Sequence, residues 1–158
     1  METAADFSRR LFIEHPCNCA QAVLATFAER FGLPGETALH LAAPFGGGMG
    51  RSGAGACGAV SGALLALGLA AGRLGRPAAE TNELAYRLAG DFLARFKRAH
   101  DAWHCQPLLN LDIGTAEGWA EARAKGLFST LCPGFVETAV ILVEEILAEL
   151  GLPDPGTK

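Results

Sequence analysis

The sequence predicts an all-α protein, a compact single-domain helical bundle of about six helices. Its 158 residues include 29 Ala and 22 Leu but only 9 Val and Ile together. Ala and Leu favour helices, whereas the β-branched residues that favour strands are scarce. Apolar residues also recur with the 3.6-residue period of a helix along most of the chain. A chain of this length forms one hydrophobic core, so we expect one domain over residues 1–158.

Apolar periodicity, together with Asn, Pro and Gly at the expected helix ends, places the helices in order along the chain. They are expected at about 4–13, 18–31, 34–44, 56–71, 77–97, 115–126 and 133–150, with a weak helical turn at 107–111. The stripes are clearest from Leu84 to Phe96 and from Val136 to Leu150. A glycine-rich loop is expected at 45–53, and a flexible tail at 152–158.

The segment between Arg51 and Arg73 has no charged residue and is long enough to cross a membrane. Its small residues include Gly58 and Gly62, a spacing that allows close helix packing in membranes and in crowded soluble cores alike. Because Gly and Ala dominate and large aliphatic residues are few, we interpret it as a buried core helix and expect no membrane insertion.

Charge and motif patterns exclude two other classes of function. The formal net charge is −4, and no run of Lys and Arg could follow a phosphate backbone, so nucleic-acid binding is not expected. Residues 48–53 fit G-x-G-x-x-G, but a dinucleotide fingerprint requires a preceding strand and an acidic residue about 20 positions later, and both are lacking. We therefore interpret the glycines as a tight loop that allows close approach.

The five cysteines are the first feature that points to a function. No secretory signal is recognisable at the start, which predicts a cytoplasmic protein whose thiols stay reduced and serve metal binding or thiol chemistry. Four of them fall at expected helix starts: Cys19, Cys57, Cys105 and Cys132. A helix N-terminus stabilises a thiolate, the form that binds metals and attacks disulfides. We expect at least three of these four sulfurs to converge.

Two further residues near this set have no clear role from the pattern. Cys17 forms a C-x-C pair with Cys19 but lies outside the helix, so a shared metal, a strained disulfide and a bystander thiol all stay open. His104 lies beside Cys105 and is either a ligand, a proton relay or a solvated loop residue.

At these residues the sequence resembles the C_GCAxxG_C_C family of redox-active proteins. The resemblance rests on residues 18–23, 45–51 and 57–62, followed by single cysteines at Cys105 and Cys132, and it covers about residues 15–150. It implies that Cys19, Cys57, Cys105 and Cys132 are the functional set, both as redox-active residues and as metal ligands. It also implies a redox partner, which the sequence does not identify, and an association with a transport system.

Three functions remain open for the four cysteines. An iron–sulfur cluster for electron transfer or redox sensing suits all-thiolate ligation, with Gly47, Gly48 and Gly58 as candidate cofactor-binding residues that leave room and offer N–H groups. Metal-free thiol–disulfide chemistry suits thiols of low pKa but lacks a C-x-x-C pair. A structural zinc site with four cysteine ligands lacks the paired ligands of short knuckles. We expect an oxidoreductase-like redox protein and favour the cluster.

Overall fold

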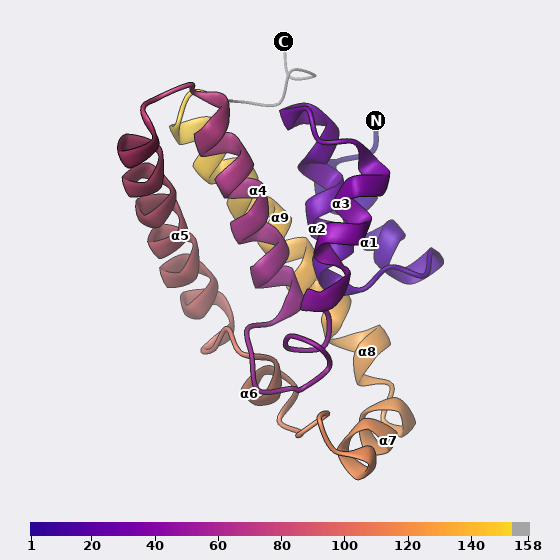
Figure 1. The fold of residues 1–158 in the computed structure, drawn as a ribbon. Coiled ribbons are helices and arrows are strands. Elements are labelled where there is room, and N and C mark those ends of the chain that lie inside the picture. Colours follow the sequence, from indigo (N-terminus) through magenta and orange to yellow (C-terminus); the bar gives the residue numbers. More distant parts are fainter. Residues whose placement is uncertain (153–158) are drawn as a thin grey trace.

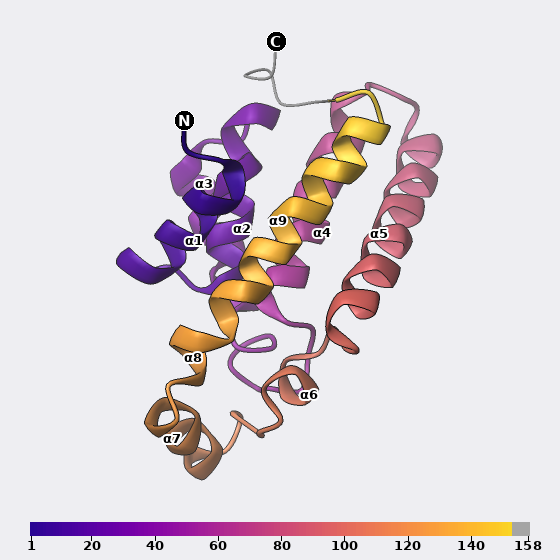
Figure 2. The same ribbon diagram turned by 180° about the vertical axis from the view of Figure 1, so that it is seen from behind.

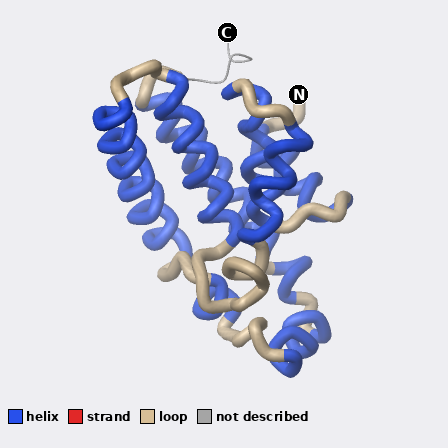
Figure 3. Tube along the Cα trace, in the orientation of Figure 1, coloured by secondary structure: helices blue, strands red, loops and turns tan. Residues whose placement is uncertain are grey.

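The computed structural model describes residues 1–152 of the chain. Within them the polypeptide is mostly helical and contains no β-strand, which confirms the predicted all-α class (Figure 3). The α-helices are α1 (Ala4–Glu14), α2 (Cys19–Ala28), α3 (Gly35–Ala42), α4 (Gly58–Arg73), α5 (Ala78–His100), α6 (Cys105–Leu109), α7 (Ala116–Ala124), α8 (Leu127–Thr130) and α9 (Cys132–Glu149). Short 3₁₀ turns follow α2 (Glu29–Phe31) and α3 (Ala43–Phe45).

The predicted number of about six helices is too low, since the described part of the chain holds nine α-helices. The difference lies in short helices such as α6, with five residues, and α8, with four. Segments of this length cannot display a 3.6-residue repeat, so apolar periodicity does not detect them. The tail expected at 152–158 falls outside the described residues except for Leu152.

The long helices form the body of the bundle. In both views α4 and α9 occupy its middle, with α5 on one flank and α1, α2 and α3 on the other (Figures 1 and 2). Phe92 and Phe96 of α5 and Val136 and Val140 of α9 are buried, as the apolar stripes predict. At one end of the bundle lie the glycine loop and helices α6, α7 and α8. Helices α2, α4 and α9 all begin at this end.

Helices α2 and α4 approach each other closely because α4 presents glycines to α2. A Cβ built on Gly62 would lie 2.7 Å from the carbonyl oxygen of Ala20, and one built on Gly58 would lie 3.0 Å from the amide nitrogen of the same residue. No real side chain fits at such distances, so the two backbones are in contact only because these positions are glycine. The Gly58-x-x-x-Gly62 spacing thus serves core packing.

Among the helices of residues 1–152, none is by itself both long and apolar enough to cross a membrane. A bent pair, Ala116–Ala124 with Leu127–Glu149, meets the length and composition only when its two parts are taken together across a 57° bend.

The glycine contact yields a stability prediction with a control on the same helix. Gly62→Ala should lower the free energy of unfolding by about 1–3 kcal/mol, because the added methyl group forces α2 and α4 apart. Gly68 is an exposed residue of α4 with nothing within 4 Å of a built Cβ. Gly68→Ala should therefore raise the free energy by about 0.5–1 kcal/mol. Denaturant titration of both variants measures the difference, and equal effects would contradict the packing described.

Candidate functional site

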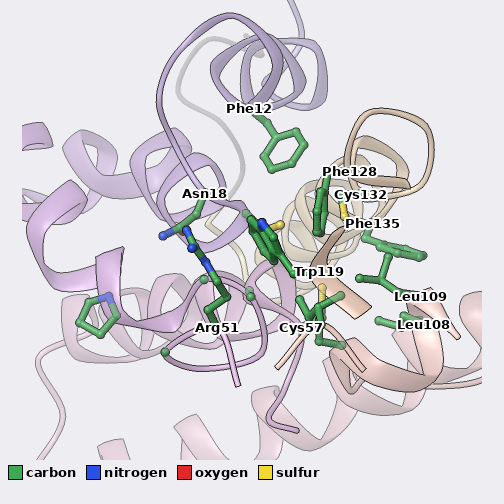
Figure 4. Close-up of a pocket in the computed structure, with 18 of the residues that line it drawn as sticks. Phe12, Asn18, Arg51, Cys57, Leu108, Leu109, Trp119, Phe128, Cys132 and Phe135 are labelled. Carbon is green, nitrogen blue, oxygen red and sulfur yellow. The ribbon is translucent and has the colours of Figure 1, made fainter. Parts of the chain in front are cut away.

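The four cysteines at helix starts line one cavity of about 490 Å³ at the loop end of the bundle (Figure 4). Cys19 is the first residue of α2, Cys105 of α6 and Cys132 of α9, whereas Cys57 immediately precedes α4. The sequence predicted Cys132 as the residue just before its helix, whereas it is the first residue of α9. It predicted Cys57 within the first turn of its helix, whereas Cys57 is the residue just before α4. The structure thus brings together all four of these cysteines.

The start of α2 is fixed by Asn18. Its side chain accepts a hydrogen bond from the N–H of Gln21, while the Gln21 side chain accepts one from the N–H of Asn18. The Asn18 amide also donates to the carbonyl of Ala43, 2.9 Å away, and so ties the helix start to the end of α3. This reciprocal cap holds Cys19 at the cavity edge, where its Cβ lies 3.0 Å from the Cβ position of Gly58.

Cys57 and Cys105 are held side by side by backbone pairing between two segments far apart in the sequence. The N–H of Cys57 donates to the carbonyl of Trp103 over 2.9 Å, and the N–H of Cys105 donates to that of Gly55 over 3.1 Å. Ala56 and His104 form the isolated antiparallel bridge between these two bonds. The chain therefore fixes both cysteines through main-chain atoms, without using their thiols.

The glycine loop packs against Cys105 and uses its N–H groups internally. Gly48 has φ +71°, and a Cβ there would lie 2.8 Å from the Cβ of Cys105. The N–H groups of Gly50, Arg51 and Gly53 donate to loop carbonyls at 2.7, 3.1 and 2.9 Å. These three N–H groups therefore stabilise the loop itself.

The glycines predicted to bind a cofactor occupy different places. Gly47 and Gly58 line the cavity beside the cysteines. Gly48 is not one of the lining residues and instead allows the loop to contact Cys105. Whether any of the three binds a cofactor stays a prediction.

The remaining wall of the cavity is apolar and largely aromatic, with Phe12, Trp119, Phe128 and Phe135 on it. Trp119 of α7 packs on Phe128 of α8, with ring centroids 4.7 Å apart. Of the lining residues that the structure describes, Arg51 alone carries a charge, and its guanidinium lies 4.2 Å from the centroid of the Trp119 ring. The sequence analysis did not identify Trp119 or Phe128 as site residues, because neither belongs to a recognisable motif.

Burial and mutual contact set the pKa values of the four thiols. Burial raises the pKa of Cys57 to about 12, although the N–H groups of Ala59 and Val60 act in the opposite direction. Burial also raises the pKa of Cys105 to about 11, with a contribution from nearby Cys132. A cavity without metal therefore keeps both of these thiols protonated at neutral pH.

The thiols of Cys19 and Cys132 interact with each other. Side-chain hydrogen bonding between them raises the pKa of Cys19 and lowers that of Cys132. Cys132 is therefore the cysteine of this set whose thiolate forms most readily. Its position at the start of α9 adds the favourable end of a helix dipole.

The four cysteines line the cavity but do not form a compact metal-ligand group. Within residues 1–152, no three Cys, His, Asp or Glu side chains form a ready ligand set for one metal ion. A tetrahedral zinc site needs its thiolates about 2.3 Å from a common centre, so this arrangement is not an assembled zinc site.

Cys17 and His104 lie outside this set. Cys17 borders two other surface cavities, and neither it nor His104 is among the residues that line the cavity of the four cysteines. The His104 ring stacks on that of Trp103 with centroids 4.0 Å apart. The structure thus separates Cys17 from its sequence neighbour Cys19.

The fold and the cavity together define a class of protein, a small helical bundle with a cluster of four thiols at one end. The chain belongs to the C_GCAxxG_C_C family, whose model is described as "Putative redox-active protein (C_GCAxxG_C_C)" and matches residues 17–146. This match confirms the resemblance. No curated protein and no solved structure matches the chain.

The Cys19–Cys132 contact predicts the order of thiol reactivity. In metal-free, reduced protein at pH 7–8, iodoacetamide should modify Cys132 before Cys57 and Cys105, because only the Cys132 pKa is lowered. Removing the donor, as in Cys19→Ala, abolishes the hydrogen bond and should shift the rise of Cys132 alkylation to higher pH. Peptide mapping by mass spectrometry across pH 6–10 measures this, and an unchanged Cys132 profile would contradict the pairing.

Proposed function

We propose that the protein is a redox protein that holds an iron–sulfur cluster with Cys19, Cys57, Cys105 and Cys132 and uses it for electron transfer or redox sensing. The observation that carries this proposal is the meeting of four cysteines, from four separate helix starts, around one apolar cavity. The family description, redox-active, supports the same general chemistry.

The donor set and the shape of the cavity fit such a group. All-thiolate ligation is typical of iron–sulfur clusters, and no carboxylate or imidazole is among the described lining residues to compete. The sulfur ligands of an iron–sulfur cluster lie farther apart than the sulfur ligands of a single zinc ion, because the cluster contains several atoms. Four cysteines distributed around about 490 Å³ suit a cluster better than zinc.

The chain's own residues would keep the centre dry and electrically balanced. Aromatic and aliphatic side chains cover the cavity, which excludes water and influences the potential of a bound centre. The N-terminal ends of α2, α4 and α9 offset the negative charge of thiolates beside them. A cluster, when bound, would supply one-electron transfer.

Cysteine replacement tests the proposal with a matched control inside the chain. Protein purified anaerobically should contain iron and acid-labile sulfide and absorb in the visible range. Serine at position 19, 57, 105 or 132 should remove most of the iron, whereas Cys17→Ser should retain it, because Cys17 lies outside the cavity.

Circular dichroism of the metal-free variants separates a lost ligand from a lost fold. Iron content equal in all five serine variants, or zinc in place of iron and sulfide in the parent protein, would refute the cluster.

The contact between Cys19 and Cys132 favours a second candidate, a metal-free dithiol. Cys132 thiolate would attack a partner disulfide and release one partner thiolate, and Cys19 would then displace the second. The protein gains an internal disulfide, and the partner disulfide is reduced to two thiols. A Cys19–Cys132 disulfide in oxidised protein that contains neither iron nor zinc would favour this candidate over the cluster.

A further inference from the structure

We propose that the mouth of the four-cysteine cavity binds a small organic carboxylate, with the carboxylate on the guanidinium of Arg51 and the apolar body against Trp119. The inference names a ligand for the site of the proposed function and rests on that function for its purpose. The binding itself depends on the cavity and on Arg51, not on a cluster.

Arg51 is an exposed cation without an ion-pair partner, and it lines an otherwise uncharged, apolar cavity. Among residues 1–152, the ion pairs of Arg and Lys side chains involve Arg10, Arg30, Arg95 and Lys125, and none involves Arg51. Its side chain makes no hydrogen bond to the described residues, and its charge has no counterpart among the lining groups. Its guanidinium is therefore free to pair with an anion that reaches it from solvent.

The guanidinium is held in place by Trp119. It lies over the indole ring, 4.2 Å from the centroid, so its face is occupied and its N–H edge stays available. Stacking of this kind removes most of the freedom of the long side chain before a ligand arrives. Figure 4 shows Arg51 and Asn18 on one side of the cavity and Leu108, Leu109 and Phe135 on the other.

The backbone at Arg51 is strained, which points to a role for its side chain. Arg51 has φ +59° and Met49 has φ +64°, both in the left-handed region, whereas the other loop positions with positive φ, such as Gly47, Gly48 and Gly50, are glycine. An arginine in this conformation costs stability that glycine would avoid. The contacts that its side chain makes are with the cavity and Trp119.

A single guanidinium beside an apolar lining suits a small carboxylate. The loop N–H groups at Gly50, Arg51 and Gly53 are bonded to the carbonyls of Pro44, Gly46 and Gly47, so these three do not compete with Arg51 for a ligand. A single guanidinium fork matches the two oxygens of a carboxylate. The aromatic lining beside Arg51, with Trp119 in contact with its guanidinium, suits a small apolar body attached to the carboxylate.

Benzoate and its neutral analogue benzamide test the proposal on the intact protein. Benzoate should bind saturably and change the fluorescence of Trp119, measured in a Trp103→Phe background, while benzamide should bind at least about tenfold more weakly. Arg51→Gln should weaken benzoate binding by about tenfold or more, and Arg51→Lys, which keeps the charge but not the fork, should fall between. Arg123→Gln removes an α7 charge outside this cavity and should leave binding unchanged.

Benzoate and benzamide are also titrated by calorimetry into each variant, before and after iron is removed with a chelator. Iron is assayed in every sample. Dependence on Arg51 in both samples supports the carboxylate site whether or not a cluster is present. Benzamide binding equal to benzoate, equal affinity in Arg51→Gln and Arg123→Gln, or no saturable binding in either sample would overturn it.

Discussion

The close contact between the backbones of α2 and α4 is the constraint on which the site depends. Gly58 and Gly62 bring α4 against Ala20, and the same contact places Cys19 beside the residue that follows Cys57. With any larger side chain at these two positions the helix starts would separate, and the thiols at their ends would separate with them. A packing feature of the core therefore determines the distance between two functional side chains.

The second constraint is that the thiols are buried without cationic partners. Burial raises the pKa of Cys57 and Cys105, so in metal-free protein these side chains are neutral and compatible with apolar walls. Ligation would deprotonate them, and the resulting charge would be shared between the metal and the N-terminal ends of α2, α4 and α9. The site is thus stable as neutral thiols and chemically suited to hold a thiolate-bound group.

Sequence reasoning recovered those parts of the fold that depend on local pattern. The stripe from Leu84 to Phe96 and the start of α2 at Asn18 follow from periodicity and capping, and the four cysteines were identified because helix starts can be located from Asn, Gly and Pro. Contacts between segments far apart in the sequence could not be predicted. The hydrogen bond between Cys57 and Trp103 and the stacking of Arg51 on Trp119 are of this kind, and no local sequence pattern indicates either of them. The single turn α8 was missed since four residues cannot show a helical repeat.

Iron-edge X-ray absorption of the anaerobically purified protein tests most directly the claim that four thiols share one centre. We expect a first shell made of sulfur alone, with iron–iron scattering from a cluster, because the described lining of the cavity offers cysteine and no imidazole or carboxylate. The same spectrum should be found in Cys17→Ser. A first shell dominated by nitrogen or oxygen, or a protein that takes up no iron although its four cavity cysteines are reduced, would contradict it.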